Sequence, residues 1–276
     1  MAQQRRLRAV VAYTVLLLWT LFVGLPLYWL IVRAFGQRQG NGGAALFPWI
    51  DFQRGLQAFH AVFVEQGDLY NLPFLNSTIV ALSTALISTL IGSAAGYALA
   101  RFRFRIGPWQ NNQIAFAFLI QRMFPPAVLL IPFLLLYRTL NLLDSRSGLI
   151  LAYCAFNIPF VVWIMRDFFR SLPVEVEESG LIDGCNRVGV LLRIAIPLAL
   201  PGFATSFVLV MIASWNEFLF ALTLLFIKVV TVPLVLSGAG YEGLAVLTLA
   251  SLLPMVVLGL LFERSIVRGL MFGVVD

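Results

Sequence analysis

Glu178-Ser-Gly-Leu-Ile-Asp-Gly-Cys-Asn-Arg-Val-Gly-Val-Leu-Leu-Arg-Ile-Ala-Ile-Pro197 is a short polar segment in a chain that is otherwise almost entirely apolar. Leu172 and Pro173 precede it, and proline is well tolerated in the first turn of a helix. Gly184 can turn the chain without steric cost, and Pro197 and Pro201 close the segment. The pattern predicts two short helices joined by a turn and lying across a membrane surface.

The composition of the rest of the chain excludes an ordinary soluble domain. Hydrophobic residues make up 61% and charged residues 12% of the chain, whereas roughly a quarter of the residues in soluble domains are charged. The net charge is +6, but the arginines flank apolar segments, which argues against a nucleic acid partner. With two cysteines and one histidine, the chain predicts neither a disulfide framework nor a metal site.

Six apolar segments are long enough to cross a bilayer, which takes about 20 residues per helix. The sequence therefore predicts an all-α, polytopic membrane protein with one domain, 1–276, a core of about 70–265 and an N-terminal span of about 9–32. That first span is too long for a signal peptide and lacks a small-residue cleavage site. Pro125, Pro126 and Pro132 predict a kink in the third span, facing protein or a cavity. The other expected spans are about 74–100, 109–137, 149–165, 201–227 and 244–262.

The distribution of basic residues predicts the orientation in the membrane. Twelve arginines fall on the side of the polar segment, and five arginines and Lys228 fall on the other side. By the positive-inside rule, both termini and the loop of about 171–200 are cytoplasmic. The longest loop, about 34–73, then lies outside, where it is available to an external partner.

The polar segment resembles the EAA loop of ABC importer permeases, which docks onto a separate ATPase subunit. The resemblance assigns ATPase coupling to Glu178, Ser179, Gly180, Asp183, Gly184, Ile194 and Pro197. Family members usually have alanines where this chain has Ser179 and Gly180, and both of these residues are equally small. A small side chain leaves the backbone open to close approach by another protein.

Further motifs resemble the second permease of maltose-type, carbohydrate-uptake ABC importers, which have the type I importer fold. They are Asn76-Ser-Thr, Tyr97-Ala-Leu-Ala-Arg-Phe102, Met123-Phe-Pro-Pro126 with Ile131-Pro132, Ser214-Trp-Asn-Glu-Phe218 and Arg268-Gly-Leu-Met-Phe-Gly273. The tail departs from the family, because it ends Val274-Val275-Asp276 without lysine, and this puts a tail contact with the ATPases in doubt.

The resemblance implies a set of partners and a location. The partners are a second homologous permease, a pair of ABC ATPases that bind ATP and magnesium, and an extracytoplasmic solute-binding protein that delivers a sugar-like solute. The location is the cytoplasmic (inner) membrane of a bacterium or archaeon, with several passes through the lipid bilayer. No catalytic residue, cofactor or metal ligand is expected in this chain, which has no Gly-x-x-x-x-Gly-Lys-Ser/Thr phosphate loop.

Two charges, Arg122 and Glu217, are expected at membrane depth, where a charge is costly and usually faces a partner or water. Both spans start from the cytoplasmic face, so the two side chains are predicted to reach each other. Either they tether two helices, or they line the translocation pathway with Gln121, Asn157, Trp215 and Asn216. Gly92 and Gly96 also form a Gly-x-x-x-Gly face for close helix contact, with a neighbour in this chain or in a partner.

The expected mechanism is alternating access driven by the ATPases, with the docked hairpin turning the fifth span through Pro197 and Pro201. A stand-alone secondary transporter or channel for a small polar solute is the alternative, and it usually carries an internal repeat, which this sequence lacks. An intramembrane enzyme is disfavoured, because the single histidine lies outside the predicted spans.

Overall fold

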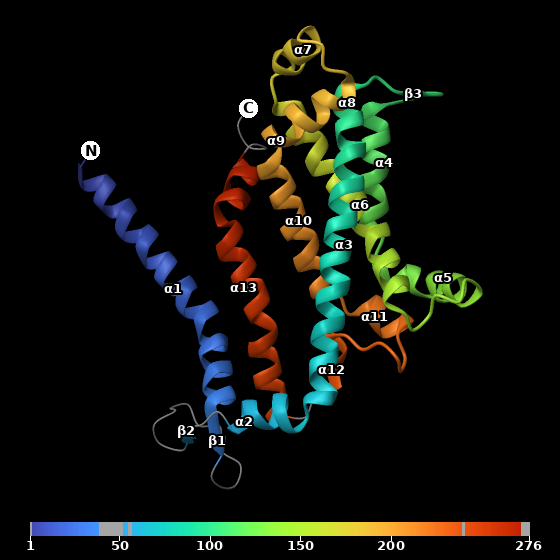
Figure 1. Ribbon diagram of the computed structural model, residues 1–276. Coiled ribbons are helices and arrows are strands. Elements are labelled where there is room, and N and C mark those ends of the chain that lie inside the picture. The colour runs from blue at the N-terminus through green and yellow to red at the C-terminus, as the bar shows by residue number, and fades with distance from the viewer. Residues whose placement is uncertain (1, 39–51, 55–56, 239–240, 272–276) are drawn as a thin grey trace. The chain divides into compact units, whose positions relative to one another are not determined.

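The computed structural model describes residues 2–38, 52–54, 57–238 and 241–271, and it is almost entirely helical (Figure 1). The all-α prediction is confirmed. The chain divides into two compact units: Met1–Asn71 with Gly238–Leu253, and Leu72–Ser237 with Pro254–Asp276. Residues 39–51 of the predicted outer loop and the tail residues 272–276 lie outside the described residues.

The first unit is built on α1 (Ala2–Phe35), a helix that is apolar on all sides. Its large side chains are almost all exposed, with Trp19 at 66% and Phe22 at 73%, as expected for a helix that lipid surrounds. Phe35 packs on Phe59, with ring centroids 4.9 Å apart. The remaining elements are β1 (Gly36–Arg38) paired antiparallel with β2 (Phe52–Arg54), α2 (Gln57–His60), η1 (Ala61–Glu65), the start of α3 (Gly67–Arg101) and the first half of α13 (Tyr241–Met271).

The second unit holds the main helical core. Its elements are the rest of α3, β3 (Arg105–Ile106), β4 (Trp109–Gln110), α4 (Asn111–Met123), α5 (Pro126–Thr139), α6 (Arg146–Ser171), α7 (Val174–Ile182), α8 (Arg187–Val190), η2 (Leu191–Ala195), α9 (Ile196–Leu198), α10 (Leu200–Trp215), α11 (Leu219–Leu224), α12 (Val232–Gly238) and the end of α13. Met165 and Phe169 of α6 are fully buried at the centre of this core.

α3 and α6 pack closely because Gly92 and Gly96 have no side chains. A Cβ added at Gly92 would lie 2.6 Å from Cβ of Val161, and one at Gly96 would lie 2.8 Å from the backbone nitrogen of Arg166. The Gly-x-x-x-Gly face therefore has its neighbour in the same chain, a question that the sequence left open. Small residues let two backbones approach in this way within membranes.

Two of the predicted spans are broken. α4 and α5 form an angle of 89° at Phe124 and Pro125, because Pro126 starts a new helix and the chain is already extended before it. The kinked third span is thus two helices. The fifth helix also ends early, since α10 stops at Trp215 and the chain restarts as α11.

The described residues contain four helices that are long and apolar enough to cross a membrane, with ranges 8–35, 69–101, 146–171 and 243–263. Two bent pairs bring the number up to six: α4 with α5, and Arg187–Leu198 with Leu200–Trp215, which meet at 73°. The multi-pass membrane architecture is confirmed. Which face each end occupies stays a prediction.

Candidate functional site

Residues 173–198 form the predicted helix-turn-helix, here called the surface hairpin. Its first arm is α7, with Glu175 and Glu177 in the first turn, where the positive end of the helix dipole favours carboxylates. Its second arm is α8, which continues through η2 and α9 to Leu198. Figure 1 shows the hairpin at one end of the second unit, beside β3 and the N-terminal end of α4.

The turn of the hairpin is a Schellman motif, which explains the glycine at its centre. The Cys185 N–H donates to the Gly180 carbonyl at 3.0 Å, and the Gly184 N–H donates to the Leu181 carbonyl at 3.1 Å. These are the two bonds that define this helix ending. Gly184 has a φ of +89°, a region that side chains with a Cβ rarely adopt. The predicted turn is confirmed, and its geometry requires glycine.

The second arm begins at a side-chain cap. The side-chain oxygen of Asn186 accepts from the Gly189 N–H at 2.7 Å, which satisfies one of the amide donors exposed at a helix start. The hairpin is therefore fixed locally on both sides of Gly184.

The two small residues of the motif differ in exposure. Ser179 is exposed, and its hydroxyl donates to the Glu175 carbonyl at 2.8 Å. Gly180, by contrast, is buried inside the hairpin, and a Cβ there would overlap Cδ1 of Ile194. The prediction that Gly180 is open to another protein is wrong, because this glycine lets the two arms of the hairpin pack together.

The outer surface of the hairpin carries exposed apolar side chains next to the turn. Ile182 is 85% exposed and Val188 is 61% exposed. Glu178, Asp183 and Pro197 are also exposed. An apolar patch rimmed by charged residues is typical of a protein contact surface.

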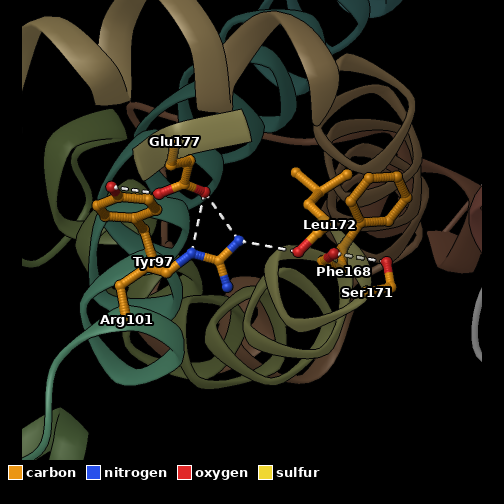
Figure 2. A network of polar contacts seen from close by, with 6 residues as sticks. All are labelled: Tyr97, Arg101, Phe168, Ser171, Leu172 and Glu177. Atoms are coloured by element: carbon orange, nitrogen blue, oxygen red, sulfur yellow. Dashed lines mark hydrogen bonds and ion pairs between the residues drawn. The ribbon is translucent and has the colours of Figure 1, made fainter. Parts of the chain in front are cut away.

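A buried cluster around Glu177 attaches the hairpin to α3 (Figure 2). Oε1 of Glu177 accepts from Nε of Arg101 at 2.9 Å and forms an ion pair with Nη2 of the same arginine at 2.8 Å. Oε2 accepts from the Tyr97 hydroxyl at 3.0 Å. Arg101 also donates to the Leu172 carbonyl at 3.2 Å. The side chains of Arg101 and Glu177 are only 9% and 8% exposed, so this cluster is an internal connection.

Tyr97 and Arg101 belong to a motif that resembles the family, but their contact with Glu177 was not predicted from the sequence. Spacing to Gly184 directed attention to Glu178, but the structure buries Glu177 and leaves Glu178 exposed. The available signal was the pair Tyr97 and Arg101, four residues apart and hence on one face of the helix end. A buried guanidinium and a buried hydroxyl both need a hydrogen-bond acceptor, and a carboxylate can accept from both.

Other polar contacts hold the same end of the second unit together. Nη2 of Arg166 and Nη2 of Arg170 both donate to Oδ1 of Asn112, at 2.6 and 3.3 Å. The guanidinium of Arg187 lies 5.4 Å from the ring centroid of Phe102. Four arginines that the sequence assigned to one side, those at 101, 166, 170 and 187, thus contact residues at the hairpin end.

Gln121 and Arg122 contact the backbone of α6 one turn before Pro159, where the helix lacks one amide donor. Pro159 has no N–H to donate to the Ala155 carbonyl, and Nε2 of Gln121 donates to that carbonyl at 3.1 Å. Nη1 of Arg122 donates to the Phe156 carbonyl at 3.2 Å and to Oδ1 of Asn157 at 3.3 Å. These contacts connect α4 to α6. A role in the translocation pathway stays a prediction.

Glu217 does not pair with Arg122: no ion pair joins them among the residues that the structure describes. Instead, the Glu217 carboxylate accepts from the N–H groups of Phe220 and Ala221, at 3.0 and 3.3 Å, and so caps α11. Each charge is thus satisfied by backbone groups. Because α10 ends at Trp215, the expected continuous helix to Glu217 does not form.

The remaining candidates for the pathway differ in exposure. Asn157 is buried, and its Nδ2 donates to the Tyr153 carbonyl at 2.9 Å. Trp215 is 3% exposed and packs in the core, whereas Asn216 is exposed and donates to the Ile212 carbonyl at 2.9 Å. In this conformation Trp215 has no free face for a ligand, and Asn216 is accessible.

Gln121→Ala is expected to lower the free energy of unfolding by about 1 kcal/mol, because the Ala155 carbonyl loses its side-chain donor. In a Pro159→Ala background, residue 159 has an N–H that can donate to the Ala155 carbonyl. Gln121→Ala should then change the free energy of unfolding by close to zero. Thermal unfolding of the four purified variants in detergent measures this difference. Equal losses in both backgrounds would contradict the assignment.

Comparison with known proteins places these features in a family context. The family model for the binding-protein-dependent transport system inner membrane component matches residues 88–268. The chain is 34% identical over 223 residues to the trehalose transport system permease protein SugB of Mycobacterium tuberculosis, covering 76% of this chain and 78% of that protein. It is 31% identical to the diacetylchitobiose uptake system permease protein NgcG of Streptomyces coelicolor, covering 81% of this chain and 71% of that protein.

Two further comparisons agree with these. The arabinooligosaccharides transport system permease protein AraQ of Bacillus subtilis is 32% identical, covering 75% of this chain and 74% of that protein. The fold is similar to that of a chain in the crystal structure of a bacterial ABC transporter involved in the import of the acidic polysaccharide alginate. The TM-score is 0.74 at 23% identity, covering 96% of this chain and 98% of that chain.

Proposed function

Because the chain belongs to the family of binding-protein-dependent transport system inner membrane components, we propose that it is a permease subunit of an ATP-driven importer for a sugar or sugar-like solute. A second permease completes the translocation pathway, two ATPase subunits bind ATP and magnesium, and an external solute-binding protein delivers the solute. The chain itself is a transport subunit that hydrolyses no ATP. It resides in the cytoplasmic (inner) membrane of a bacterium or archaeon.

The relatives support a carbohydrate as the solute. Three of them, at 31–34% identity, are named for the transport of trehalose, diacetylchitobiose and arabinooligosaccharides. These solutes share many hydroxyl groups and few charges. The proposed solute class is therefore sugars and sugar-like solutes.

The surface hairpin is the observation that carries the coupling role. Its turn is fixed by the Schellman motif at Gly184 and its second arm is capped by Asn186. It presents Ile182 and Val188 to the outside, beside the charges of Glu178 and Asp183. A rigid, pre-formed surface loses little conformational entropy when a partner binds, which suits an element that a motor subunit must move.

In the proposed cycle, ATP binding closes the two ATPases and moves the hairpin. The movement opens the space between the two permeases toward the solute-binding protein, and hydrolysis reverses it. A ligand shifts the equilibrium between two conformations only if it binds one of them more tightly than the other. ATP acts here through the ATPases alone.

Reconstitution in liposomes tests this function. The chain with its ATPases and second permease should take up sugar only with ATP inside and loaded binding protein outside, and the chain alone should give no uptake. Uptake by the chain alone, driven by an ion gradient, would support the stand-alone transporter instead. An assembly that never forms with an ATPase would also overturn the proposal.

Cys185 offers a test of orientation with a native residue. It lies in the turn of the hairpin and is partly exposed, whereas Cys154 is buried. A membrane-impermeant maleimide should label Cys185 in inside-out vesicles and leave it unlabelled in right-side-out vesicles. The opposite pattern would place the hairpin outside the cell, where no ATPase can dock. Cys185→Ser controls for labelling of Cys154.

A further inference from the structure

We propose that α3 is the element that transmits movement of the surface hairpin to the opposite end of the second unit, with Glu177, Arg101 and Tyr97 as positioning residues at one end and Asn76 and Ser77 at the other. The proposal rests on the coupling function proposed above. It differs from the expected route through Pro197 and Pro201 into α10.

The covalent route into α10 contains a sharp bend. The second arm of the hairpin ends at Leu198, and α10 starts at Leu200 at an angle of 73° to it. Ala199 links the two helices, because its N–H donates to the Ala195 carbonyl at 2.9 Å and its carbonyl accepts from the Phe203 N–H at 3.0 Å. Pro201, in the first turn of α10, has no N–H, so the backbone ladder is interrupted there. Such a junction bends more easily than a helix does.

The contact with α3 is much more constrained. Both carboxylate oxygens of Glu177 are occupied by donors on α3, at 2.9 Å from Arg101 and 3.0 Å from Tyr97. Moving α7 away from α3 would leave a buried carboxylate and a buried guanidinium unpaired, which is strongly unfavourable. Figure 2 shows that Arg101 also reaches Leu172, which lies between α6 and the hairpin. The first arm and the end of α3 therefore move together.

α3 is straight enough to carry that movement. Its only internal proline, Pro73, precedes Asn76. Between Asn76 and Arg101 the helix is about 38 Å long at 1.5 Å per residue. Gly92 and Gly96 pack it against α6, so the two helices form one body. Since sharp kinks in helices occur mostly at proline and similar interruptions, this stretch of α3 bends less readily than the junction before α10.

The far end of α3 holds a second segment of the chain, residues 225–232, here called the distal loop. Nδ2 of Asn76 donates to the Val230 carbonyl at 2.8 Å, and Oγ of Ser77 accepts from the buried Val232 N–H at 2.9 Å. Nε of Arg146 donates to Oδ1 of Asn76 at 2.8 Å. The distal loop exposes Phe226 and Ile227, at 60% and 85%. Movement of α3 thus reaches an exposed surface at the opposite end of the unit.

A fluorescent probe on the distal loop tests the transmission in the assembled transporter. Cys154 and Cys185 are first replaced by serine, and Ile227→Cys is labelled with an environment-sensitive dye. ATP with the hydrolysis-deficient ATPase should change its emission. Glu177→Gln should remove this change and reduce stimulation of the ATPase by loaded binding protein about tenfold, within the range of coupling between distant sites. Glu175→Gln, an exposed change in the same helix turn, should preserve both.

Ser77→Ala separates transmission from a local effect on the hairpin. It leaves every contact of Glu177 in place and removes the partner of the Val232 N–H. A reduced probe response is expected, smaller in its loss than that of Glu177→Gln, because Asn76 and Asp144 still hold the distal loop. Tyr97→Phe serves if Glu177→Gln fails to accumulate. In all variants the ATPases should co-purify normally and keep their basal activity.

Distinct outcomes separate this proposal from the proposed function. A normal probe response in Glu177→Gln or Ser77→Ala overturns transmission through α3 and leaves the ATP-driven importer intact. Loss of the ATPases from Glu177→Gln also overturns it, since the cluster would then only shape the docking surface. Failure of the unmodified chain to bind any ATPase contradicts the proposed function itself.

Discussion

Gly184→Glu should reduce ATP-driven sugar uptake at least about tenfold, while the protein still reaches the membrane. A residue with a Cβ held at the φ of +89° found here carries a strain of about 1–3 kcal/mol, and 1.4 kcal/mol corresponds to a factor of ten. The strain is relieved by opening the turn, which displaces the surface that the ATPase contacts. Uptake in vesicles and the amount of membrane-inserted protein measure the two effects.

A graded series at Gly184 separates strain from bulk. Nothing lies within 4 Å of a Cβ at this position, so Gly184→Ala tests the backbone alone. Gly184→Asn should retain more uptake than Gly184→Ala, because asparagine tolerates positive φ better. Gly107→Ala is the matched control, since Gly107 also has a positive φ and open space but lies in the ribbon of β3 and β4. Normal uptake in Gly184→Glu would exclude a docking role for the turn.

Asp144→Ala should lower the midpoint of thermal unfolding by on the order of 10 °C. Asp144 lies between α5 and α6, and its carboxylate accepts from the N–H groups of four residues in the distal loop at 2.8–3.1 Å, namely Phe226, Ile227, Lys228 and Val229. Charge-assisted bonds of this kind contribute about 1.5–3 kcal/mol each when protected from water. Since the site is partly exposed, we expect the free energy of unfolding to fall by about 2–4 kcal/mol in total. A loss of this size lowers the unfolding midpoint by on the order of 10 °C.

The same carboxylate predicts a dependence on pH. Burial by itself raises the pKa of Asp144, but the four N–H donors outweigh it and hold the pKa below its usual value. The unfolded chain therefore takes up the proton first, near pH 4. The stabilisation is complete above that pH and decreases as the pH falls toward the lower pKa of the folded state.

Thermal unfolding between pH 3 and 7 checks both statements about Asp144. Asp144→Asn should lose stability at neutral pH and show a weaker fall in acid than the unmodified chain. Asp167→Asn is the control, because Asp167 is 51% exposed and 4.0 Å from Arg166, and such pairs contribute little. If Asp144→Asn matches the unmodified chain at pH 7, the four bonds do not stabilise the fold.

Features encoded by neighbouring residues could be predicted from the sequence. Apolar length located the long helices, and the order of Pro173, Gly184 and Pro197 predicted the hairpin. These succeed because capping and turn geometry depend on residues a few positions apart. The membrane-crossing ranges within α3, α6 and α13, which are 69–101, 146–171 and 243–263, agree with the expected spans to within about six residues.

Features that depend on distant pairs could not be predicted. Glu177 and Arg101 lie 76 positions apart, and no local pattern indicates which of Glu175, Glu177 and Glu178 is buried. The break after Trp215 also has no proline or glycine to mark it. There Glu217 caps a new helix, a choice that depends on how the surrounding helices pack. Hydropathy measures the length of an apolar segment and contains no information on its direction.

The contact of Gln121 with the Ala155 carbonyl has a consequence for building hybrid permeases. Pro159 leaves that carbonyl without its usual amide donor, and the donor comes from another helix. A chimera that exchanges α4 without α6 would place an unmatched oxygen in hydrocarbon, where water cannot compensate. Crossover points for domain shuffling should therefore keep Gln121 and Pro159 on the same parental fragment.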